Sequence, residues 1–238
     1  MAERKFYDLN IASGIDRVQA IKRAEELELG GICLTHCYKG ESELEEYLKK
    51  IEELRSNAKL EIISGVMLNG EGMEAIAKKL RRKVDLILAY GGNYHINRLA
   101  CSSDYIDLLC HPERGRRDCG LDHVCCREAH DHNTVIEVNF GQILNSSGGK
   151  RVREIYLLKE IVRLCLKSKC PFVVNSGAKT VQGMRGGREL SALSCVLGAQ
   201  IYPSIVSNSD LPEQLVKMNR EKTVQPLSGV YVDYEGQA

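Results

Sequence analysis

The sequence has few aromatic residues, with no tryptophan and three phenylalanines among its 238 residues. Proteins that recognise unstacked RNA bases stack them on aromatic rings, and such rings are scarce here. Tyr90 and Tyr94 flank one loop, but no RNP-like motif surrounds them. If this chain binds RNA, we expect recognition through shape and phosphates rather than through base stacking.

Long apolar runs are also missing, since no segment approaches the roughly 18 residues needed to span a bilayer. The N-terminus passes from residues 1–5 directly into a strand-like segment, FYDLNIA at 6–12. That arrangement leaves no room for the apolar region of a signal peptide. We therefore expect a soluble, cytoplasmic protein without a membrane partner.

No linker or low-complexity segment interrupts the chain, which suits one large domain over residues 1–238. Nor is there a strong excess of one charge, because the formal net charge is +1. The charge is uneven, however: residues 41–55 carry six glutamates, whereas ERGRRD at 113–118, GKRVR at 149–153 and KTVQGMRGGR at 179–188 are basic. Binding depends on where charge lies on the surface, so this asymmetry matters more than the sum.

Cysteine is abundant, with ten residues. Several lie inside apolar runs, where a free thiol behaves as a small hydrophobic side chain: Cys33, Cys110, Cys165 and Cys195. A domain of this length has no need of disulfides, so we expect reduced thiols.

Seven short apolar runs alternate with polar loops and amphipathic segments, at 6–12, 31–36, 60–68, 84–90, 106–112, 134–140 and 171–177. Runs rich in Ile, Val and Leu are typical of parallel strands covered on both faces. The alternation predicts an α/β fold of the TIM-barrel-like βα-barrel type, with an open doubly wound sheet as the competing architecture. No eighth strand is evident, so we expect an irregular or incompletely closed barrel.

Helical periodicity is clearest in ELEEYLKKIEELRS, at 43–56, and in the stripe from Ile155 to Cys165. The first helix is expected to begin near Ser13, with Asp16 in its first turn. After residue 187 the chain predicts C-terminal helices, and 223–238 are expected to form a loosely held tail.

In a βα-barrel the loops that follow the strands form the functional face. Those loops hold many basic residues and few acidic ones: Lys39, Arg98, Arg114, Arg116, Arg117, Lys150, Arg151, Arg153, Lys179, Arg185 and Arg188. Guanidinium groups on glycine-rich loops can hold phosphates in bidentate fashion. We therefore predict one positive end that binds RNA or another anion, although any single arginine could equally be a solvated loop charge.

Metal-dependent phosphoester hydrolysis is the alternative chemistry. Asp8 and Asn10, two apart on one strand, are expected to face the same side, as are Glu137 and Asn139. With His36 and His111 they could form a metal site, or simply a hydrogen-bonded barrel interior. Histidines at strand ends are too few for a zinc hydrolase. We therefore expect no resident metal, and keep Asp8, His36, His111 and Glu137 as the alternative set.

A second concentration of metal-binding residue types occurs in CGLDHVCCREAHDH at 119–132, with Cys119, His123, Cys125, Cys126, His130 and His132. It lacks two joined C-x2-C pairs, and adjacent cysteines fall on different faces of a helix. We expect a short helix with two thiols and exposed histidines. Neither a Walker motif nor GxGxxG occurs in the sequence.

Several loop sequences together resemble ribonuclease P protein component 3, the thirty-kilodalton subunit family of archaeal and eukaryotic enzymes. The matching segments span nearly the whole chain in order: FYDLNI at 6–11, YGGNYHINRLA at 90–100, DLLCHPERGRRDCGLDH at 107–123, VIEVNFGQIL at 135–144, PFVVNSGAK at 171–179 and MRGGRELSALSCVLG at 184–198. The succession of HPE, EVNF and SGA is the specific part of this resemblance.

The resemblance implies a TIM-barrel-like fold, related to polymerase-histidinol phosphatase barrels but lacking most of their metal ligands. It further implies a subunit that binds ribonuclease P RNA together with ribonuclease P component 2. The complex removes the 5′ leader from precursor tRNA, with the chemistry performed by the RNA and its magnesium ions. On this view the isolated chain is not catalytic and binds no cofactor of its own.

The same resemblance implies RNA contacts at Arg98, Arg114, Arg116, Lys179, Arg185 and Arg188. Relatives often carry Arg-Ser-Pro-Arg before their final helices, whereas here Gly186 and Gly187 separate the two arginines. We expect these glycines to loosen the arginine spacing.

Overall fold

A computed structural model describes residues 4–224 of the chain. Its centre is a sheet of parallel strands in the order β1-β2-β3-β4-β5-β6-β7. The strands are β1 (Tyr7–Ile11), β2 (Gly31–Cys37), β3 (Glu61–Leu68), β4 (Leu86–Tyr90), β5 (Leu108–Cys110), β6 (Val135–Asn139) and β7 (Phe172–Asn175). Each lies within or overlaps one of the seven predicted apolar runs, so the βα-barrel prediction is confirmed. The strictly sequential order excludes a doubly wound sheet.

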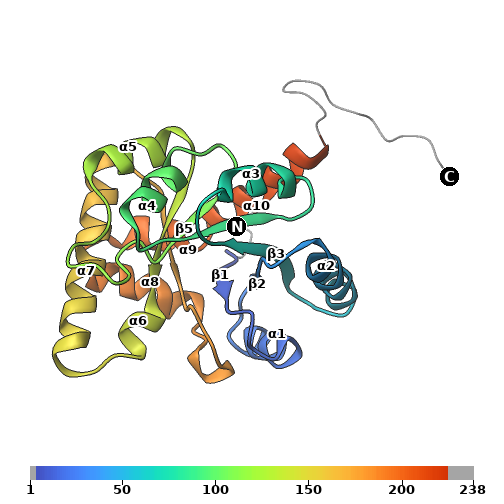
Figure 1. The fold of residues 1–238 in the computed structure, drawn as a ribbon. Helices are drawn as coiled ribbons and strands as arrows, with labels where there is room; N and C mark the ends of the chain where they lie inside the picture. Colours follow the sequence, from blue (N-terminus) through green and yellow to red (C-terminus); the bar gives the residue numbers. More distant parts are fainter. Residues whose placement is uncertain (1–3, 225–238) are drawn as a thin grey trace.

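Helices surround the strands (Figure 1). They are α1 (Arg17–Glu26), α2 (Glu41–Arg55), α3 (Met73–Leu80), α4 (Tyr94–Cys101), α5 (His123–Asp131), α6 (Phe140–Leu144), α7 (Gly148–Ser168), α8 (Gly187–Val196), α9 (Ile201–Asn208) and α10 (Asp210–Val224), with a 3-10 turn, η1 (Val181–Gly183). Among residues 4–224, none of these helices combines the length and apolar character of a membrane span.

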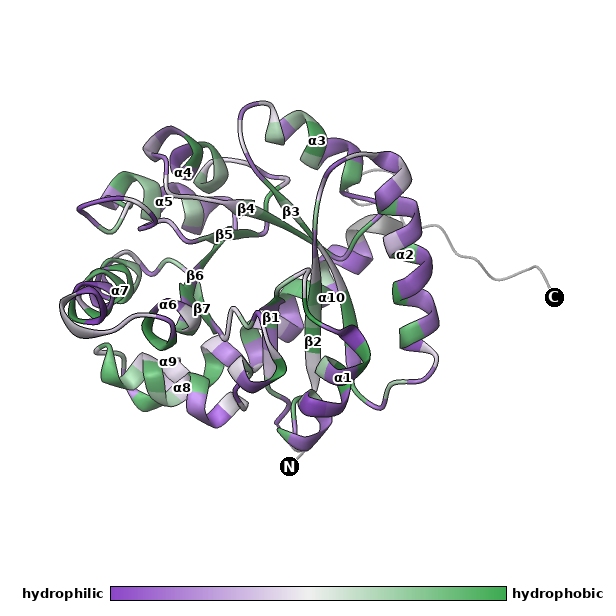
Figure 2. Cartoon of the chain, turned by 60° about the horizontal axis from the view of Figure 1, so that its bottom comes forward, coloured by the Kyte–Doolittle hydropathy of each residue, from purple (hydrophilic) through white to green (hydrophobic). Residues whose placement is uncertain are grey.

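The strands are buried on both faces, which explains their nearly continuous apolar sequences. One face points into the barrel, where Leu9, Leu88 and Val173 belong to a single cluster. The other face packs beneath the helices, as Ile87 and Ile136 do. In Figure 2 the strands at the centre are largely green, while the surrounding helices carry both green and purple residues.

Residues 4–224 contain no eighth strand, and the gap between β1 and β7 is closed mainly by side chains. The backbone N–H of Leu9 donates to Oδ1 of Asn175 at 2.9 Å. Asp8 Oδ1 accepts from the N–H of Ser176 at 3.2 Å. These bonds take the place of a strand ladder, so the barrel is nearly closed. The absence of an eighth strand from the sequence had predicted an incompletely closed barrel.

Helices α8 and α9 cover this seam from outside. Asn208 of α9 donates through Nδ2 to the carbonyl oxygen of Val174 at 2.5 Å. A Cβ added to Gly187 would lie 2.1 Å from Cβ of Phe6, so only glycine permits this approach of α8 to the segment before β1.

Helix α10 fills the opposite end of the barrel, where the strands begin. Leu215 and Val216 join the interior cluster. Asn219 donates to the carbonyl oxygen of Asp85 at 3.0 Å and to Oδ1 of Asp107 at 2.9 Å, and these two acids immediately precede β4 and β5. The base of the barrel is therefore closed by a helix.

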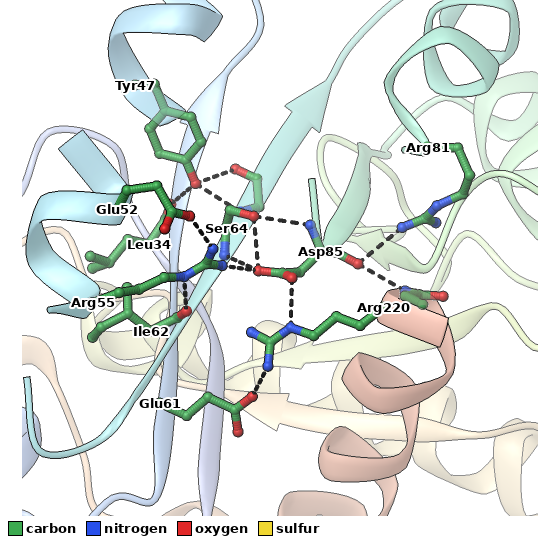
Figure 3. Close-up of polar contacts among 12 residues, drawn as sticks. Leu34, Tyr47, Glu52, Arg55, Glu61, Ile62, Ser64, Arg81, Asp85 and Arg220 are labelled. Carbon is green, nitrogen blue, oxygen red and sulfur yellow. Dashed lines mark hydrogen bonds and ion pairs between the residues drawn. The ribbon is translucent and has the colours of Figure 1, made fainter. Parts of the chain in front are cut away.

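An ionic network built on Asp85 holds that helix in place (Figure 3). The Asp85 carboxylate accepts from Nε of Arg220 at 2.7 Å, from the N–H of Ser64 at 2.7 Å and from the Arg55 guanidinium. Arg220 also pairs with Glu61 at the start of β3. One buried carboxylate thus connects α10, α2 and two strands.

Two local predictions need correction or qualification. Helix α1 begins at Arg17, and the side chain of Asp16 caps it by accepting from the N–H of Gln19 at 2.9 Å. The start predicted near Ser13 is therefore wrong, because the stronger capping residue is the aspartate itself. Of the tail predicted for 223–238, residues 223 and 224 end α10, and 225–238 lie outside the described residues.

Candidate functional site

The strands end at a cavity of about 480 Å³, which we call the mouth. Its polar lining comes from loops and strand ends all around the barrel: Asn10, Ser13, Thr35, Asn69, Tyr90, His111, Asn139, Gln142, Asn145 and Lys179. A cavity at the carboxyl ends of parallel strands is the expected location for function in this fold.

Glu137 lies below the mouth and is fully buried. Three amide groups surround its carboxylate: Nδ2 of Asn10 at 2.7 Å, of Asn175 at 3.0 Å and of Asn139 at 3.2 Å. The last contact confirms that Glu137 and Asn139 face the same side. Because donors already occupy this carboxylate, it is built to accept hydrogen bonds, and a cation would have to displace them.

His111 is the titratable residue at the floor of the mouth. Its Nδ1 lies 3.0 Å from Nε2 of Gln142 and 3.8 Å from Oε1 of Glu113, and its Nε2 lies 3.9 Å from Oε2 of Glu137. Burial lowers the pKa of His111, but the neighbouring carboxylates of Glu113 and Glu137 outweigh that effect and the net shift is upward. The two carboxylates therefore favour the protonated form of this imidazole.

Asp8 occupies the seam rather than the mouth. The register between β1 and β2 is irregular from Asp8 to Ile11. As a result Asp8 faces Ser176, whereas Asn10 reaches Glu137 inside the barrel. The prediction that Asp8 and Asn10 point the same way is wrong, because a strict two-residue alternation fails at a bulge. Burial raises the pKa of Asp8 to about 7 despite hydrogen bonds from Ser176 and Asn10.

His36 lies outside the barrel. Its ring stacks on Tyr47 of α2 with centroids 5.0 Å apart, and burial lowers its pKa, with the nearby charge of Arg17 acting in the same direction. The alternative metal set therefore divides among three places: His36 beneath α2, Asp8 in the seam, and His111 with Glu137 in the mouth. These residues do not offer one cation a common ligand sphere.

Arginines from the loop after β5 line a depression beside the mouth, and Asn69 belongs to the lining of both. The Arg114 guanidinium lies 4.7 Å from the centroid of the Tyr90 ring. Arg116 forms a bidentate pair with Asp118 at 2.6 and 3.0 Å, and its backbone carbonyl accepts from Arg153 of α7. Rings and pairs of this kind fix the direction of the guanidinium groups.

Lys179 and Arg185 lie after β7. Lys179 is exposed and lines the mouth. Both line a depression beside it, and the Arg185 guanidinium lies 5.3 Å from the centroid of the Phe140 ring. Arg114, Arg116, Lys179 and Arg185 are together called the mouth cations below.

The remaining two predicted RNA contacts lie farther from the cavity. Arg98 is on α4, where it pairs with Glu128 of α5 at 3.5 Å. Arg188 is exposed in the first turn of α8. The glycines that separate Arg185 from Arg188 are buried, and Gly187 packs closely on Phe6. The expectation that they loosen the arginine spacing is wrong, since close packing fixes the backbone between them.

Sequence reasoning missed the aromatic supports beneath these arginines. Tyr90 is the last residue of β4 and Phe140 directly follows β6, so each ring lies under an arginine from a different loop. An aromatic residue at a strand terminus was the available signal. The pairing with Arg114 and Arg185 depends on neighbouring strands and could not be read from local sequence.

Comparison with known proteins gives a consistent result. The family model described as RNase P subunit p30 matches residues 5–224. Ribonuclease P protein component 3 of Methanococcoides burtonii is 28% identical over 236 residues, covering 98% of this chain and 95% of that protein. The corresponding protein of Methanocaldococcus jannaschii is 31% identical over 191 residues, covering 79% of this chain and 82% of the relative.

A solved structure agrees with the sequence match. A chain in the cryo-EM structure of archaeal ribonuclease P with mature tRNA superimposes with a TM-score of 0.82 at 26% identity, covering 97% of this chain and 98% of that one. The family match extends from before β1 into the end of α10, and therefore includes the mouth, the seam and the helical plug. This chain belongs to the RNase P subunit p30 family and is a protein subunit of ribonuclease P.

Proposed function

We propose that this subunit uses the mouth cations to bind the phosphate backbone of ribonuclease P RNA, and so supports removal of the 5′ leader from precursor tRNA. The observation that carries the proposal is their placement: Lys179 lines the mouth, Arg185 lines a depression that shares Lys179 with it, and Arg114 and Arg116 line a depression that shares Asn69 with it. A polyanion laid across the mouth would contact both groups and release its counterions. Arg98 and Arg188 extend the same proposed surface over α4 and α8.

The chemistry is assigned to the RNA and its magnesium ions rather than to the protein. Glu137 is surrounded by amide donors, and the alternative metal set is divided among three places. What the protein would supply is positive charge and a fixed shape. The whole chain is proposed to act as one RNA-binding domain within a cytoplasmic particle.

Component 2 of ribonuclease P is the proposed protein partner. The chain exposes apolar side chains on both sides of the α8–α9 turn, with Val196 74%, Ile201 72% and Tyr202 68% exposed. Neighbouring apolar residues of this size mark interaction surfaces. Ile201→Glu should weaken co-elution with component 2 in size-exclusion chromatography, while Val18→Glu, a change at an exposed site on α1, should leave it intact.

Reconstitution tests the function directly. The cognate RNA and component 2 are assayed on precursor tRNA at moderate magnesium, with and without this chain. We expect cleavage to rise when the chain is added, and the chain alone to cleave nothing. If the metal-loaded chain cleaved precursor tRNA alone, and His111→Ala abolished that cleavage, the alternative function, metal-dependent phosphoester hydrolysis, would be established instead.

The RNA-binding surface is tested by the salt dependence of affinity. Replacing Arg114, Arg116 and Lys179 by alanine should weaken RNA binding and reduce the slope of log affinity against log salt by roughly two units, since each lost phosphate contact removes about 0.7–0.9. Arg163→Ala is the matched control, because Arg163 is paired with an acid, as Arg116 is, but lies on α7 and lines neither the mouth nor the depressions beside it. An unchanged slope in the triple variant would remove the mouth from the RNA interface.

A further inference from the structure

Three cysteines meet in a part of the molecule that the proposed RNA surface does not use. Cys126 belongs to α5, Cys165 to α7, and Cys170 to the turn before β7. Their sulfur atoms all lie within 4.8 Å of one another. The three side chains are buried and none forms a disulfide. Among the described residues, no other three Cys, His, Asp or Glu side chains converge so closely.

The sulfur spacing is within about 1 Å of that of ligands around one ion. Because a zinc–sulfur bond is about 2.3 Å long, two sulfurs on a tetrahedral zinc lie about 3.8 Å apart. The three thiols need only a small inward adjustment to reach that separation. Three protein ligands leave one position of a tetrahedral ion open.

The backbone holds two of the thiols together. Lys169 ends α7 in the left-handed conformation, with φ 55°. The chain turns back there, and the N–H of Cys170 donates to the carbonyl oxygen of Cys165 at 2.9 Å. Helix α5 packs against α7 and brings Cys126 to the pair. The arrangement therefore comes from three separate elements and does not depend on a flexible loop.

The protons of the cluster are unequally shared. The neighbouring thiols of Cys165 and Cys170 lower the pKa of Cys126. The same interactions with Cys126 raise the pKa values of Cys165 and Cys170. A soft cation that entered the cluster would displace the thiol protons and take the sulfurs as thiolate ligands.

A surface cleft of about 820 Å³ is lined by Arg127, Leu164 and Lys169, each adjacent in sequence to one of the three cysteines. The cleft carries four basic side chains, Arg127, Arg163, Lys167 and Lys169, against Asp122 and Glu160, so its net positive charge would favour thiolates nearby. The pair formed by Cys101 and Cys125 interacts closely as well, but it offers only two sulfurs.

We propose that Cys126, Cys165 and Cys170 form a thiolate site for a soft divalent cation of the zinc type. The site ties α5 and α7 to the start of β7, so its occupancy stabilises that side of the barrel. It is independent of RNA binding, and its tests need neither RNA nor component 2.

The test uses cobalt(II) as a spectroscopic probe on the full chain, kept reduced and stripped of metal by a chelator. We expect one Co²⁺ per chain, a thiolate-to-cobalt charge-transfer band in the near ultraviolet, and displacement of the band by Zn²⁺. Cys165→Ala should lose the band. Cys33→Ala should keep it, and both cysteines are fully buried, so the two variants lose matched volumes from the core.

Protection from alkylation provides a second readout in the wild-type chain, in case Cys165→Ala does not fold. Zn²⁺ should slow modification of Cys126, Cys165 and Cys170 by a thiol reagent, and leave the rate at Cys37, which is exposed, unchanged. A reduced wild-type chain that shows neither the band nor protection would overturn the proposal. So would a chain in which two of the three thiols form a disulfide in air while the reduced form binds no cobalt.

Discussion

The amide oxygen of Asn175 on β7 accepts a hydrogen bond from the backbone N–H of Leu9 on β1 at 2.9 Å. This bond joins β1 to β7 where the barrel lacks an eighth strand. The same side chain donates to Oε1 of Glu137 at 3.0 Å. One asparagine therefore links the seam of the barrel to the carboxylate beneath the mouth.

Asn175→Ala should destabilise the protein by about 2–4 kcal/mol, because the Leu9 N–H and Glu137 would each lose a buried partner at roughly 1–3 kcal/mol. Chemical denaturation measures the change. Asn57→Ala is the control, since Asn57 bonds the carbonyl oxygen of Glu53 at an exposed site. Equal effects of the two substitutions would show that the seam does not depend on Asn175.

The raised pKa of Asp8 predicts that the protein loses stability as pH rises. Its pKa in the folded protein is raised to about 7, whereas an unfolded aspartate titrates near pH ~4. The folded state therefore binds the proton more tightly, and stability falls as pH rises from about 4 through about 7. Asp8→Asn should remove this dependence, so the melting temperature of the variant relative to wild type should increase across that range. A constant difference would contradict the buried, protonated carboxyl.

The lowered pKa of Asp85 predicts the opposite pH dependence of stability. Burial raises its pKa, but the hydrogen bond from Arg220, the Ser64 N–H and the charges of Arg55 and Arg220 outweigh burial, and the net shift is downward. Its stabilisation is present above the ordinary aspartate pKa, near pH ~4, and is lost as pH falls through the lowered folded value.

At neutral pH Asp85→Asn should cost about 2 kcal/mol, below the usual 3–5 for breaking a fully buried pair because both arginines are partly exposed. Thermal denaturation of both proteins between pH about 7 and about 2 should show the difference shrink in acid. Glu52→Gln is the control: it also removes a partner of Arg55, but Glu52 is 69% exposed. A difference that persists at the lowest pH would contradict the ionic role of Asp85.

Arg98 and Glu128 should affect RNA affinity in opposite directions if the proposed RNA surface includes α4. Arg98→Ala should weaken binding and reduce the salt slope by roughly 0.7–0.9. Glu128→Gln releases the arginine from its 3.5 Å ion pair and should strengthen binding. Filter binding over a salt series measures both. Changes of the same sign would place Arg98 outside the interface.

The strands and most helices could be predicted because their evidence is local. Runs such as VIEVN, with apolar residues on both faces, specify a covered parallel strand wherever they occur. The stripe from Leu44 to Leu54 similarly predicts α2, in which Leu44, Tyr47 and Ile51 are buried. The mouth followed from the rule that loops after parallel strands gather at one end.

Features that join distant residues could not be predicted. The two-residue alternation expected of β1 predicted that Asp8 and Asn10 face the same side. The register shift between Asp8 and Ile11, which turns them apart, is seen only in the structure. Cys165 was interpreted as a core hydrophobe, and nothing in its own helix indicates Cys126 or Cys170 as neighbours. Of the candidates in 119–132, the structure brings Cys126 alone into the three-sulfur cluster, while His132 bonds Asp104 at 2.8 Å.

The helix that fills the base of the barrel follows every strand in the sequence. During translation all seven strands are therefore synthesised before α10, and a barrel formed from them has an apolar interior open at one end until α10 is added. A message truncated before Asp210 would not yield a smaller working barrel. It would yield an unclosed one, which quality-control proteases and chaperones recognise by its exposed apolar surface.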